Sequence, residues 1–551
     1  MRSSVWRMHL QDPGRARALA RLLGFHPLMA QLLLNRGVTD PGQAAQFLSP
    51  SWAGLSDPFE WSGMAQAVAR FRRAAASREP VLIFSDSDAD GLTASAILYE
   101  ALQASGLEVH AHQANRITGG YGMPRAFMEQ LPNAGARLLV LVDCGTNQPE
   151  EVLWLAERGI EVVIIDHHVP QARAAEPAAL INPHCGGAGR GMCSAGLAFK
   201  IAQALLGGAE QAAGWLDLAA IGTLADCAPL VGENRLIVSL GLSRIASTRR
   251  PGLRRLCVAS GLSTAEAEAV IRKLVPKLNA SGRLGDASAV WRLLLDRDDP
   301  RLEDDLNTVA TAHDTTRQLH RQILAEAQEQ VNRLHFRDQY VMVVSRPGWH
   351  QGLMGPLASQ LSQRYGRPAI ALAMTEEQGT GSGRSAGICN LFELLQDCRE
   401  LLVRFGGHAQ ACGLTLHRKD LDRFRERLNE RARAAFQAQD ALADPRLLDL
   451  ELTLGEIETA WVEETAKLSP FGQGNSRPTV VLRRVSLQSL SARSGTVSDG
   501  VTRLAVRGRV PVADPEGWYD VVASPALASG KLVLTLGEAR ISEAPPGPAR
   551  T

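Results

Sequence analysis

With 551 residues, the chain is too long to fold around one core, so two to four domains are expected. Its apolar fraction of 45% and charged fraction of 21% are typical of globular proteins, and no apolar run reaches the roughly 18 residues that a membrane span needs. A net charge of +1 means that nucleic-acid binding would require a local basic groove. The first residues lack the apolar core of a signal peptide, so we expect a cytoplasmic protein without membrane contact.

Residues 1–78 are predicted to be helical, and Asp40-Pro41 is a typical helix start, with a capping side chain before a proline. From residue 79 to 298 the pattern changes, because short apolar runs alternate with helical segments. This alternation predicts a parallel sheet covered by helices. Its strands are expected at Val81–Phe84, Leu138–Val142 and Val162–Ile165.

Three further regions follow along the chain. Residues 299–337 are charged and periodic, which predicts a long helix connecting two lobes. Residues 338–445 predict a second α/β domain, with a helix from about Gly352 to Tyr365 between two strands and glycine-rich loops after them. Residues 446–551 contain short β-like runs typical of a small barrel, and the tail from Glu543 is expected to be disordered.

Acidic and histidine side chains follow each predicted strand of the first sheet. The carboxyl ends of parallel strands share one edge, where ligands bind. So many like charges at one edge would repel one another unless cations lay between them. The residues are Asp86, Asp88 and Asp90 after the first strand, Asp143 after the second, Asp166, His167 and His168 after the third, and Asp226 after an apolar run.

This edge is predicted to bind two divalent cations. Two ions about 3.5–4 Å apart can activate water and stabilise the oxygens of an in-line phosphoryl displacement. Asp143 is the best candidate to bridge both ions, and carboxylates mixed with imidazole suit Mn²⁺ and tolerate Mg²⁺. Acids in such loops also serve as helix caps, and a lone His pair is often structural. These alternatives are less favoured when the residues are considered together, because each successive strand places an acid or histidine at the same edge of the sheet.

Zinc is a less favoured alternative for another part of the chain. His184, Cys185 and Cys193 lie close together, but a fourth ligand is missing and no CxxC pair occurs. Eight scattered cysteines in a chain of this length also do not form a disulfide framework.

Four segments, SDSDADGLTASAIL, VDCGTN, IDHH and GTLADCAPL, resemble in this order the signature segments of the DHH phosphoesterase family. The family takes its name from the triplet that stands here at residues 166–168. The resemblance implies a parallel α/β catalytic domain that holds two manganese ions. It implies that Asp88, Asp90, Asp143, His167 and Asp226 are metal ligands, that Asp86 and His168 lie in or near the ligand set with His168 facing the scissile phosphate, and that Asp166 orients the site.

Further segments are similar to the RecJ-like branch of this family and together cover nearly the whole chain. They are LLLNRGVTDPGQAAQFLSP, NRITGGYGMP, PKLNASGRLGDA, WHQGLMG, GSGRS, FGGHAQACGL and PFGQGN. The resemblance implies a DHH catalytic domain, a connecting helix, a substrate-binding α/β domain and an oligonucleotide-binding (OB-like) barrel. An extra C-terminal domain of some relatives is not expected. The chain departs from the pattern at Ser85, Val275, Lys277 and Gln351. Lys277 stands where an arginine is expected; it keeps the positive charge but cannot bind phosphate in the bidentate manner of arginine, which puts recognition of the 5′ end in doubt.

The branch implies a single-strand-specific DNA exonuclease that works 5′-to-3′, releases 5′-mononucleotides and serves DNA repair and recombination. Glycines flanking Ser382 would let a phosphate approach the backbone closely. A surface ion pair remains the alternative for each arginine, and loop packing the alternative for His408. The candidate substrate-binding residues are Arg116, Lys277, Asn279, Arg283, Ser382, Arg384, Gly407 and His408.

Single-stranded DNA is the expected partner of a monomer, with a single-strand-binding protein and a RecQ-type helicase as further candidates. One alternative is a DHH-family hydrolase of short oligonucleotides, cyclic dinucleotides or pyrophosphate, which the chain length and barrel-like region disfavour. The other is a non-catalytic single-strand-binding scaffold. A scaffold predicts missing metal ligands, whereas all the acids and both histidines are present.

Overall fold

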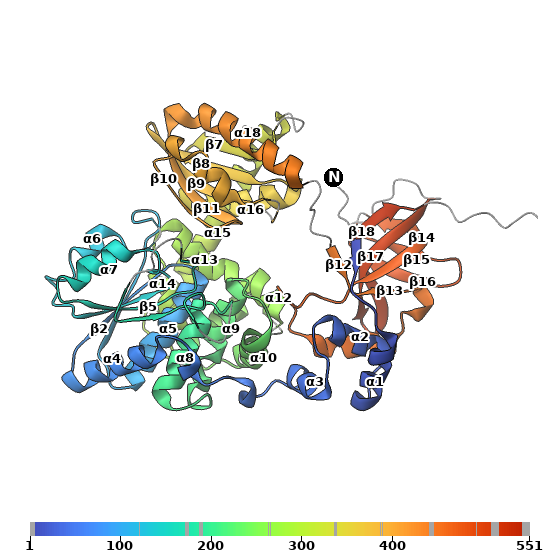
Figure 1. The fold of residues 1–551 in the computed structure, drawn as a ribbon, viewed down its shortest axis with the longest axis horizontal. Helices are drawn as coiled ribbons and strands as arrows, with labels where there is room; N and C mark the ends of the chain where they lie inside the picture. The colour runs from blue at the N-terminus through green and yellow to red at the C-terminus, as the bar shows by residue number, and fades with distance from the viewer. Residues whose placement is uncertain are drawn as a thin grey trace, which may run out of the picture. The chain divides into compact units, whose positions relative to one another are not determined.

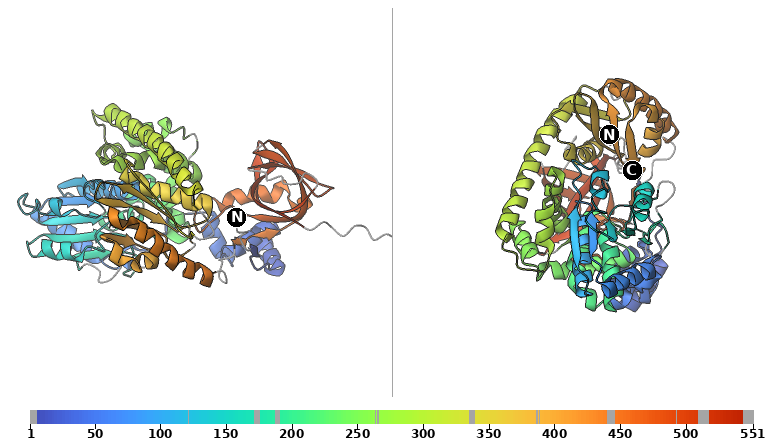
Figure 2. Two further views of the ribbon diagram at one scale, coloured as in Figure 1. Left: turned by 90° about the horizontal axis from the view of Figure 1, so that it is seen from above. Right: turned by 90° about the vertical axis from the view of Figure 1, so that its left-hand side faces the viewer.

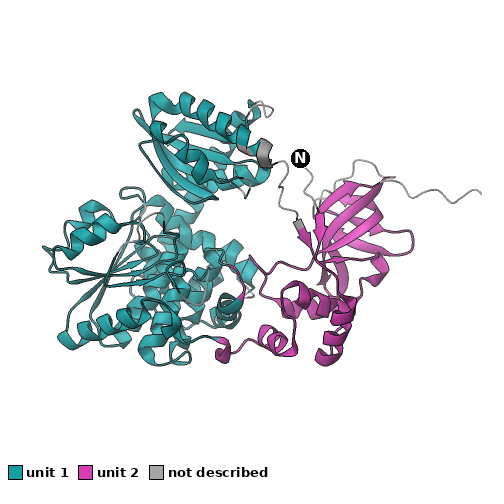
Figure 3. Cartoon of the chain, in the orientation of Figure 1, with its two compact units in different colours: residues 1, 55–228, 232–442 teal, residues 2–54, 229–231, 443–551 magenta. Residues whose placement is uncertain are grey.

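A computed structural model of the chain describes residues 6–120, 122–170, 176–186, 191–262, 264, 266–334, 339–385, 387, 389–439, 446–491, 493–508 and 517–542. The chain divides into two compact units (Figure 3). Unit 1 contains Leu55–Ala228 and Gly232–Leu442, and unit 2 contains Arg2–Gly54, Pro229–Val231 and Ala443–Thr551. The tail from Glu543, expected to be disordered, and Tyr121 of the NRITGGYGMP segment lie outside the described residues.

Unit 1 begins with a five-stranded sheet in the order β3-β2-β4-β5-β6, and every neighbouring pair is parallel (Figure 1). The three predicted strands and their parallel arrangement are confirmed. Two edge strands escaped prediction, because β3 alternates polar residues and β6 is only three residues long. The bounds are Val81–Ser85 (β2), Val109–Gln113 (β3), Leu138–Val142 (β4), Glu161–Ile165 (β5) and Ala179–Ile181 (β6).

Helices of this first lobe pack against the sheet and against one another. The helices α5, α8 and α9 are buried along most of their length, so their sequences are apolar on nearly every side. Their interior even includes Lys200, which is fully buried and paired with Glu233 at 2.9 Å. The bounds are Met64–Ser77 (α4), Ala89–Ala104 (α5), Arg125–Met128 (α6), Pro149–Ala156 (α7), Ser194–Leu206 (α8), Leu216–Ala225 (α9), Gly232–Ala246 (α10), Pro251–Ala259 (α11), Ala267–Ala269 (α12), Val275–Leu284 (α13) and Ser288–Leu294 (α14).

A long helix, α15 (Leu302–Asn332), confirms the connection predicted between two lobes. The second lobe contains a mixed sheet in the order β10-β11-β9-β8-β7, in which only β7 and β8 are parallel. Its strands are Met342–Pro347 (β7), Ala369–Met374 (β8), Gln378–Arg384 (β9), Arg404–Gly407 (β10) and Ala411–His417 (β11), and its helices are Met354–Tyr365 (α16), Leu391–Gln396 (α17) and Leu421–Gln439 (α18).

The glycine-rich segments of this lobe were predicted as loops, and that prediction is wrong. Gly381 and Gly383 lie in β9, and Gly406 and Gly407 lie in β10. A Cβ on Gly381 would lie 1.8 Å from the carbonyl oxygen of Ala371 on the neighbouring strand. Glycine is therefore required by close backbone contact inside the sheet, although such residues usually weaken a strand pattern.

Unit 2 combines the two ends of the chain. The N-terminal helices are Pro13–Leu23 (α1), Pro27–Asn35 (α2) and Pro41–Leu48 (α3), and Asp40 caps α3 as predicted by accepting a hydrogen bond from the Gln43 amide at 2.9 Å. The short strand β1 (Trp6–Met8) pairs in parallel with β12 (Arg446–Leu448). Buried leucines of α2 share one apolar core with Trp461 of α19 (Thr459–Glu464) and with the strands of a barrel.

That barrel confirms the predicted C-terminal β region. Strands β14, β15, β16, β18 and β17 are hydrogen-bonded in this order, and pairing of β17 with β14 closes the ring (Figure 2). The bounds are Leu450–Glu451 (β13), Val480–Ser491 (β14), Ser494–Ser498 (β15), Arg503–Arg507 (β16), Trp518–Ala528 (β17) and Lys531–Ile541 (β18). No helix in the described part of the chain is long and apolar enough to cross a membrane.

Candidate metal and phosphate site

The carboxyl edge of the first sheet brings the predicted acids together. Asp86, Asp143 and Asp166 each follow directly after one of three neighbouring strands. Their main-chain N–H groups donate to Val142, Ile165 and Ile181 at 3.1, 2.9 and 3.1 Å, which continues the parallel ladder by one step. The sheet itself therefore fixes the backbone from which the three side chains project.

Asp143 occupies the centre of this edge. Its backbone has a φ of 61°, the left-handed region that Asp tolerates better than most residues, and this turns the chain sharply after β4. The carboxylate accepts a hydrogen bond from Ser194 Oγ at 2.9 Å and lies 3.2 Å from His167 Nε2. Ser194 was not predicted as a site residue, because a serine at a helix start carries no distinctive signal.

Among the described residues, three groups of side chains place potential ligand atoms within 4.8 Å of one another. Asp143 belongs to two of them, which is the position expected of a bridging carboxylate. The groups are Asp143 with His167 and His168, Asp90 with His167 and Asp226, and Asp86 with Asp88 and Asp143. None includes His184, Cys185 or Cys193, so the zinc alternative gains no geometric support.

His167 links the acids of the second group. Its Nε2 atom is 3.8 Å from Asp90 Oδ2, and its Nδ1 atom is 3.7 Å from Asp226 Oδ2. Asp90 is itself held by the main-chain N–H groups of Ser194 and Ala195, each at 2.9 Å, where α8 begins. The N-terminus of a helix thus stabilises one carboxylate of the cluster.

Asp166 orients the two histidines from behind. Its Oδ1 accepts hydrogen bonds from the His167 and His168 amides at 2.8 and 3.2 Å and contacts His168 Nδ1 at 2.7 Å. Burial alone would lower the pKa of His168, but the hydrogen bond and charge of Asp166 outweigh it and raise that pKa to about 9. The expected orienting role of Asp166 agrees with these contacts.

The acids of the cluster resist ionising together. Burial and the charges of Asp88 and Asp90 raise the pKa of Asp143 well above its usual range. Burial also raises the pKa of Asp226 to about 7, although the nearby His167 lowers it. Divalent cations relieve both the desolvation and the repulsion of such carboxylates, and the donors are oxygen and imidazole without thiolate. The residues therefore fit the expected two-cation group.

Arg116, predicted to bind substrate, contacts the acids Asp86 and Asp88 directly. Its guanidinium donates two hydrogen bonds to the Asp86 carboxylate, one from Nε to Oδ1 at 2.6 Å, and a third from Nη2 to Asp88 Oδ2 at 2.9 Å. Asp88 also caps α5 by accepting from the Asp90 and Gly91 amides at 3.1 and 3.2 Å. Arg116 therefore forms the ion pair that was the alternative to phosphate binding, and Asp88 acts as the helix cap that was the alternative to metal binding.

Two other predicted arginines form a positive region, where the charge of Asp88 raises the pKa of Arg283 by less than burial and Arg116 lower it. Burial lowers the pKa of both Arg283 and Arg384, and each is further lowered by the charge of Arg116. Within the described ranges neither arginine forms an ion pair, so the ion-pair alternative does not describe them. Arg384 Nη1 donates to the Gly383 carbonyl at 2.8 Å. Half-buried guanidinium groups without carboxylate partners are suited to phosphate.

The remaining predicted substrate residues are less uniform. Ser382 lies in β9, two residues before Arg384. The Asn279 side chain accepts a hydrogen bond from the Ala89 amide at 2.7 Å and so fixes the loop that carries Asp86 and Asp88. The Lys277 ammonium donates to the Ala259 carbonyl at 2.6 Å, which anchors it at the end of α11. Burial lowers the pKa of His408, helped by the charge of His168, and its Nδ1 accepts from the Gln410 amide at 3.4 Å. Both loop packing and proximity to the site therefore apply to His408.

Two glycines and a histidine lie near residues of the positive region. Gly407 has a φ of 131°, and a Cβ there would lie 2.3 Å from the Ala411 carbonyl oxygen. A Cβ on Gly352 would lie 2.1 Å from the carbonyl oxygen of Arg283, so the WHQG segment is closely packed against α13. His320 on α15 was not predicted; its Nε2 atom is buried without a hydrogen-bond partner, and burial and Arg283 lower its pKa.

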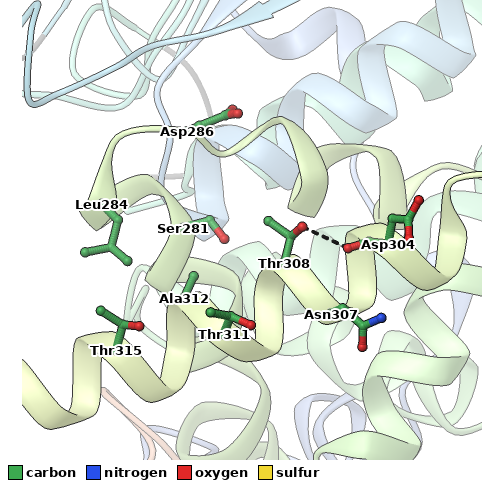
Figure 4. A pocket seen from close by; sticks show the side chains of 9 residues that line it. All are labelled: Ser281, Leu284, Asp286, Asp304, Asn307, Thr308, Thr311, Ala312 and Thr315. Carbon is green, nitrogen blue, oxygen red and sulfur yellow. Dashed lines mark hydrogen bonds between the residues drawn. The ribbon is translucent and has the colours of Figure 1, made fainter.

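A separate cavity of about 610 Å³ lies between α13 and α15 (Figure 4). Its lining contains two acids and no cationic side chain, which does not suit a phosphate. It borders the helix that carries Arg283 but includes none of the predicted site residues. The lining residues are Ser281, Leu284, Asp286, Asp304, Asn307, Thr308, Thr311, Ala312 and Thr315.

Comparisons with known proteins agree with this architecture. The chain matches the DHH family N-terminal domain over residues 80–223, the DHHA1 domain over 338–434 and the RecJ OB domain over 448–507. It is similar to the single-stranded-DNA-specific exonuclease RecJ of Bacillus subtilis, with 34% identity over 98% of this chain and 69% of that protein. Identity to the Dickeya dadantii protein of the same name is 35%, over 82% of each chain.

A solved structure gives the same result for the fold. RecJ from Thermus thermophilus in complex with Mn²⁺ superimposes with a TM-score of 0.84 at 27% identity, over 99% of this chain and 81% of that one. The same protein has also been solved in complex with Mg²⁺, with a TM-score of 0.78. The three matching domains, in this order, and the similarity along nearly the whole of this chain show that it belongs to the RecJ family.

Proposed function

We propose that this chain is a metal-dependent exonuclease that hydrolyses single-stranded DNA from the 5′ end and releases 5′-mononucleotides. The observation that carries the proposal is the complete cluster of Asp90, Asp143, His167 and Asp226 at the carboxyl edge of the sheet. The activity stated in the names of its RecJ relatives agrees with this reaction.

The cluster would hold two divalent cations, Mn²⁺ or Mg²⁺. Asp88, Asp90, Asp143, His167 and Asp226 would be the ligands, and Asp143 is shared by two of the ligand groups, to which Asp86 and His168 also belong. When bound, such ions lower the pKa of a water molecule and stabilise negative charge on a phosphoryl group.

The chain's own residues position the substrate for this chemistry. Asp166 accepts from His168 Nδ1 and so orients this imidazole, which would face the scissile phosphate. Arg283 and Arg384 bind neighbouring phosphates, since neither forms an ion pair with a carboxylate in the described part of the chain. Ser382, Gly407 and His408 complete this surface through backbone and side-chain contacts, and Lys277 and Asn279 secure the helices around it.

Specificity for single strands follows from the two kinds of domain. The barrel of unit 2 offers a surface of the class that binds single strands through backbone charge and stacking. Aromatic residues make up 5% of the chain, so backbone contacts outweigh stacking and binding is tolerant of sequence. We also propose that the protein acts in the cytoplasm as a monomer in DNA repair and recombination, together with a single-strand-binding protein and a RecQ-type helicase. The proposed domains are residues 1–78, 79–298, 299–337, 338–445 and 446–551.

The test uses 5′-phosphorylated single-stranded and blunt duplex DNA, labelled at either end, with Mn²⁺. Asp143→Asn serves as the site variant, because Asn tolerates the same positive φ, and Asp314→Asn serves as an exposed control on α15. We expect mononucleotides from the 5′ end of the single strand only, with activity lost in Asp143→Asn and kept in the control.

Two other outcomes would overturn the proposal in different ways. Turnover of dinucleotides or pyrophosphate without cleavage of long strands would keep the metal site and favour a small-substrate hydrolase. Binding of single strands without any hydrolysis would favour a non-catalytic scaffold.

A further inference from the structure

Arg116 binds two of the acids that are proposed to hold metal. Its planar fork donates twice to Asp86 and once to Asp88, and these acids form the third ligand group together with Asp143. Asp86 Oδ1 already accepts from Arg116 Nε and from the Ser87 amide, so both of its lone pairs are used. The positive guanidinium also repels a cation that approaches the remaining lone pairs of Asp86 and Asp88. A cation at this group therefore competes directly with Arg116.

The ligand group of Asp90, His167 and Asp226 is not subject to this competition. Asp90, His167 and Asp226 contact one another and the start of α8, and the described structure contains no hydrogen bond from Arg116 to any of them. The two proposed metal positions thus differ in one respect. The Arg116 guanidinium lies on the acids of one position and makes no hydrogen bond to the acids of the other.

Arg116 is placed so that its side chain can leave while the acid stays. The Arg116 side chain is 40% exposed, whereas that of Asp86 is 2% exposed. The Asn115 side chain accepts from the Ile117 and Thr118 amides at 3.0 and 3.2 Å, so the backbone around Arg116 is fixed in a turn and movement falls to the side chain. The Asp86 carboxylate is further fixed by its own neighbour, the Ser87 amide, at 2.7 Å.

A phosphate is the ligand that could draw Arg116 away. Arg283 and Arg384 stand close enough for their charges and that of Arg116 to act on one another, and neither has a carboxylate partner in the described part of the chain. An anion bound among these three groups would relieve their mutual repulsion and offer the Arg116 fork a bidentate partner in place of Asp86.

We propose that Arg116 is a built-in counter-cation that withholds the Asp86–Asp88–Asp143 position from the second metal until a terminal phosphate of the substrate takes over its guanidinium. This inference rests on the proposed two-metal function and concerns the order in which metal and substrate bind. It makes the second ion a consequence of correct substrate placement, so Arg116 is a positioning residue for the metal rather than only a phosphate contact.

The experiment measures Mn²⁺ binding to the full-length protein, without turnover. Free Mn²⁺ is followed by electron paramagnetic resonance during titration, in the presence of thymidine 5′-monophosphate, thymidine or neither, with protein-free samples correcting for Mn²⁺ bound by the nucleotide. Arg116→Gln removes the charge, Arg116→Lys keeps the charge without the fork, and Arg72→Gln is an exposed control on α4.

In the wild-type protein and the Arg72→Gln control, we expect one tight Mn²⁺ and a second that binds about tenfold more tightly with the monophosphate, but not with thymidine. In Arg116→Gln, the second Mn²⁺ should bind tightly without nucleotide, and the monophosphate should add little. Arg116→Lys should lie between the two, because a point charge holds the acids less specifically.

Three results would overturn the inference. They are two equally tight ions in the wild-type protein without nucleotide, a second ion that is unaffected by Arg116→Gln, and a single ion under every condition. Because the readout is metal stoichiometry, it is separate from the exonuclease test. A protein that fails to degrade DNA but shows the phosphate-dependent second ion would support this inference against the proposed function, and the reverse pattern would do the opposite.

Discussion

Unit 1 has two regions of opposite charge at the proposed site, one at the edge of the first sheet and one formed by α13 of the first lobe and β9 of the second. At the edge of the first sheet, acids are fixed by main-chain hydrogen bonds and paired with His167, His168 and Arg116. Around β9 and α13, Arg283 and Arg384 lack acidic partners among the described residues. The first region can hold cations and the second can hold anions. This contrast suggests that the chain separates the chemistry of hydrolysis from the grip on the DNA backbone.

Asp143→Asn should produce the largest effect, because it removes the carboxylate shared by two ligand groups. We expect a loss of hydrolysis of about 10³-fold or more, by analogy with other losses of a central catalytic group. The raised pKa of Asp143 reflects burial and repulsion, so the neutral amide should leave the metal-free protein at least as stable as the wild type. Single-turnover assays and thermal unfolding in a chelator measure the two effects. A large loss of stability would show that Asp143 is mainly structural.

Gly381→Ala tests whether close backbone packing holds the strand of the positive region in place. The acidic region is held in place by main-chain hydrogen bonds instead. The added methyl group would meet the Ala371 carbonyl oxygen, so we expect a loss of roughly 2–3 kcal/mol in unfolding free energy. Gly413→Ala on the adjacent strand is the matched control, since its Cβ would have no atom within 4 Å. Urea unfolding compares both variants. Equal stability of the two would refute the packing argument.

Arg384→Lys addresses the grip on phosphate without removing charge. Loss of the planar fork should lower kcat/KM by about tenfold on 5′-phosphorylated single strands, mainly through KM, and should leave Mn²⁺ binding to the acids unchanged. Arg399→Lys, at an exposed position of the same lobe, is the control. If Arg384→Lys reduced metal binding as much as substrate binding, the two regions would not be functionally separate.

His320 gives the smallest expected effect and tests the positive region through pH. Its folded-state pKa is lowered from 6.5 by burial and by Arg283, so the unfolded chain takes up the proton first as pH falls. The contribution of neutral His320 to the free energy of unfolding is therefore present above about pH 6.5 and is lost as the pH falls below that value. Relative to His320→Gln, the wild-type protein should lose under about 1 kcal/mol between pH 8 and pH 5 in chemical unfolding. A gain in stability at pH 5 would contradict the sign.

Much of the fold was predictable because local patterns agree with it. Apolar runs such as Leu138–Val142 are central strands buried on both faces, and the periodic, charged segment from residue 302 to 332 is a helix. The strand β9 was mistaken for a loop, since its glycines reflect contact with a distant strand that no local pattern reveals. Strand β1 pairs with residues at the other end of the chain and carries no signal of its own.

The site was predictable in composition but not in contacts. Acids at successive strand ends identify the cluster, because a parallel sheet brings those ends together. The sequence could not reveal that Arg116 lies on Asp86, that Asn279 accepts from the Ala89 amide, or that Ser194 supports Asp143. These partners come from separate elements: Arg116 follows the strand β3 that pairs with β2, Ser194 begins α8, and Asn279 lies on α13.

The pairing of the two chain ends in unit 2 has a consequence for biosynthesis. Gln11 donates a hydrogen bond to the Asp449 carbonyl 438 residues further along the chain, and the apolar residues of α2 share their core with the barrel. At rates of synthesis of about 5–20 residues per second, the first helices wait roughly 20–90 s for the strands that bury them. Leu32 and Leu33, fully buried in the finished protein, therefore remain accessible to chaperones and proteases while unit 1 is still being translated.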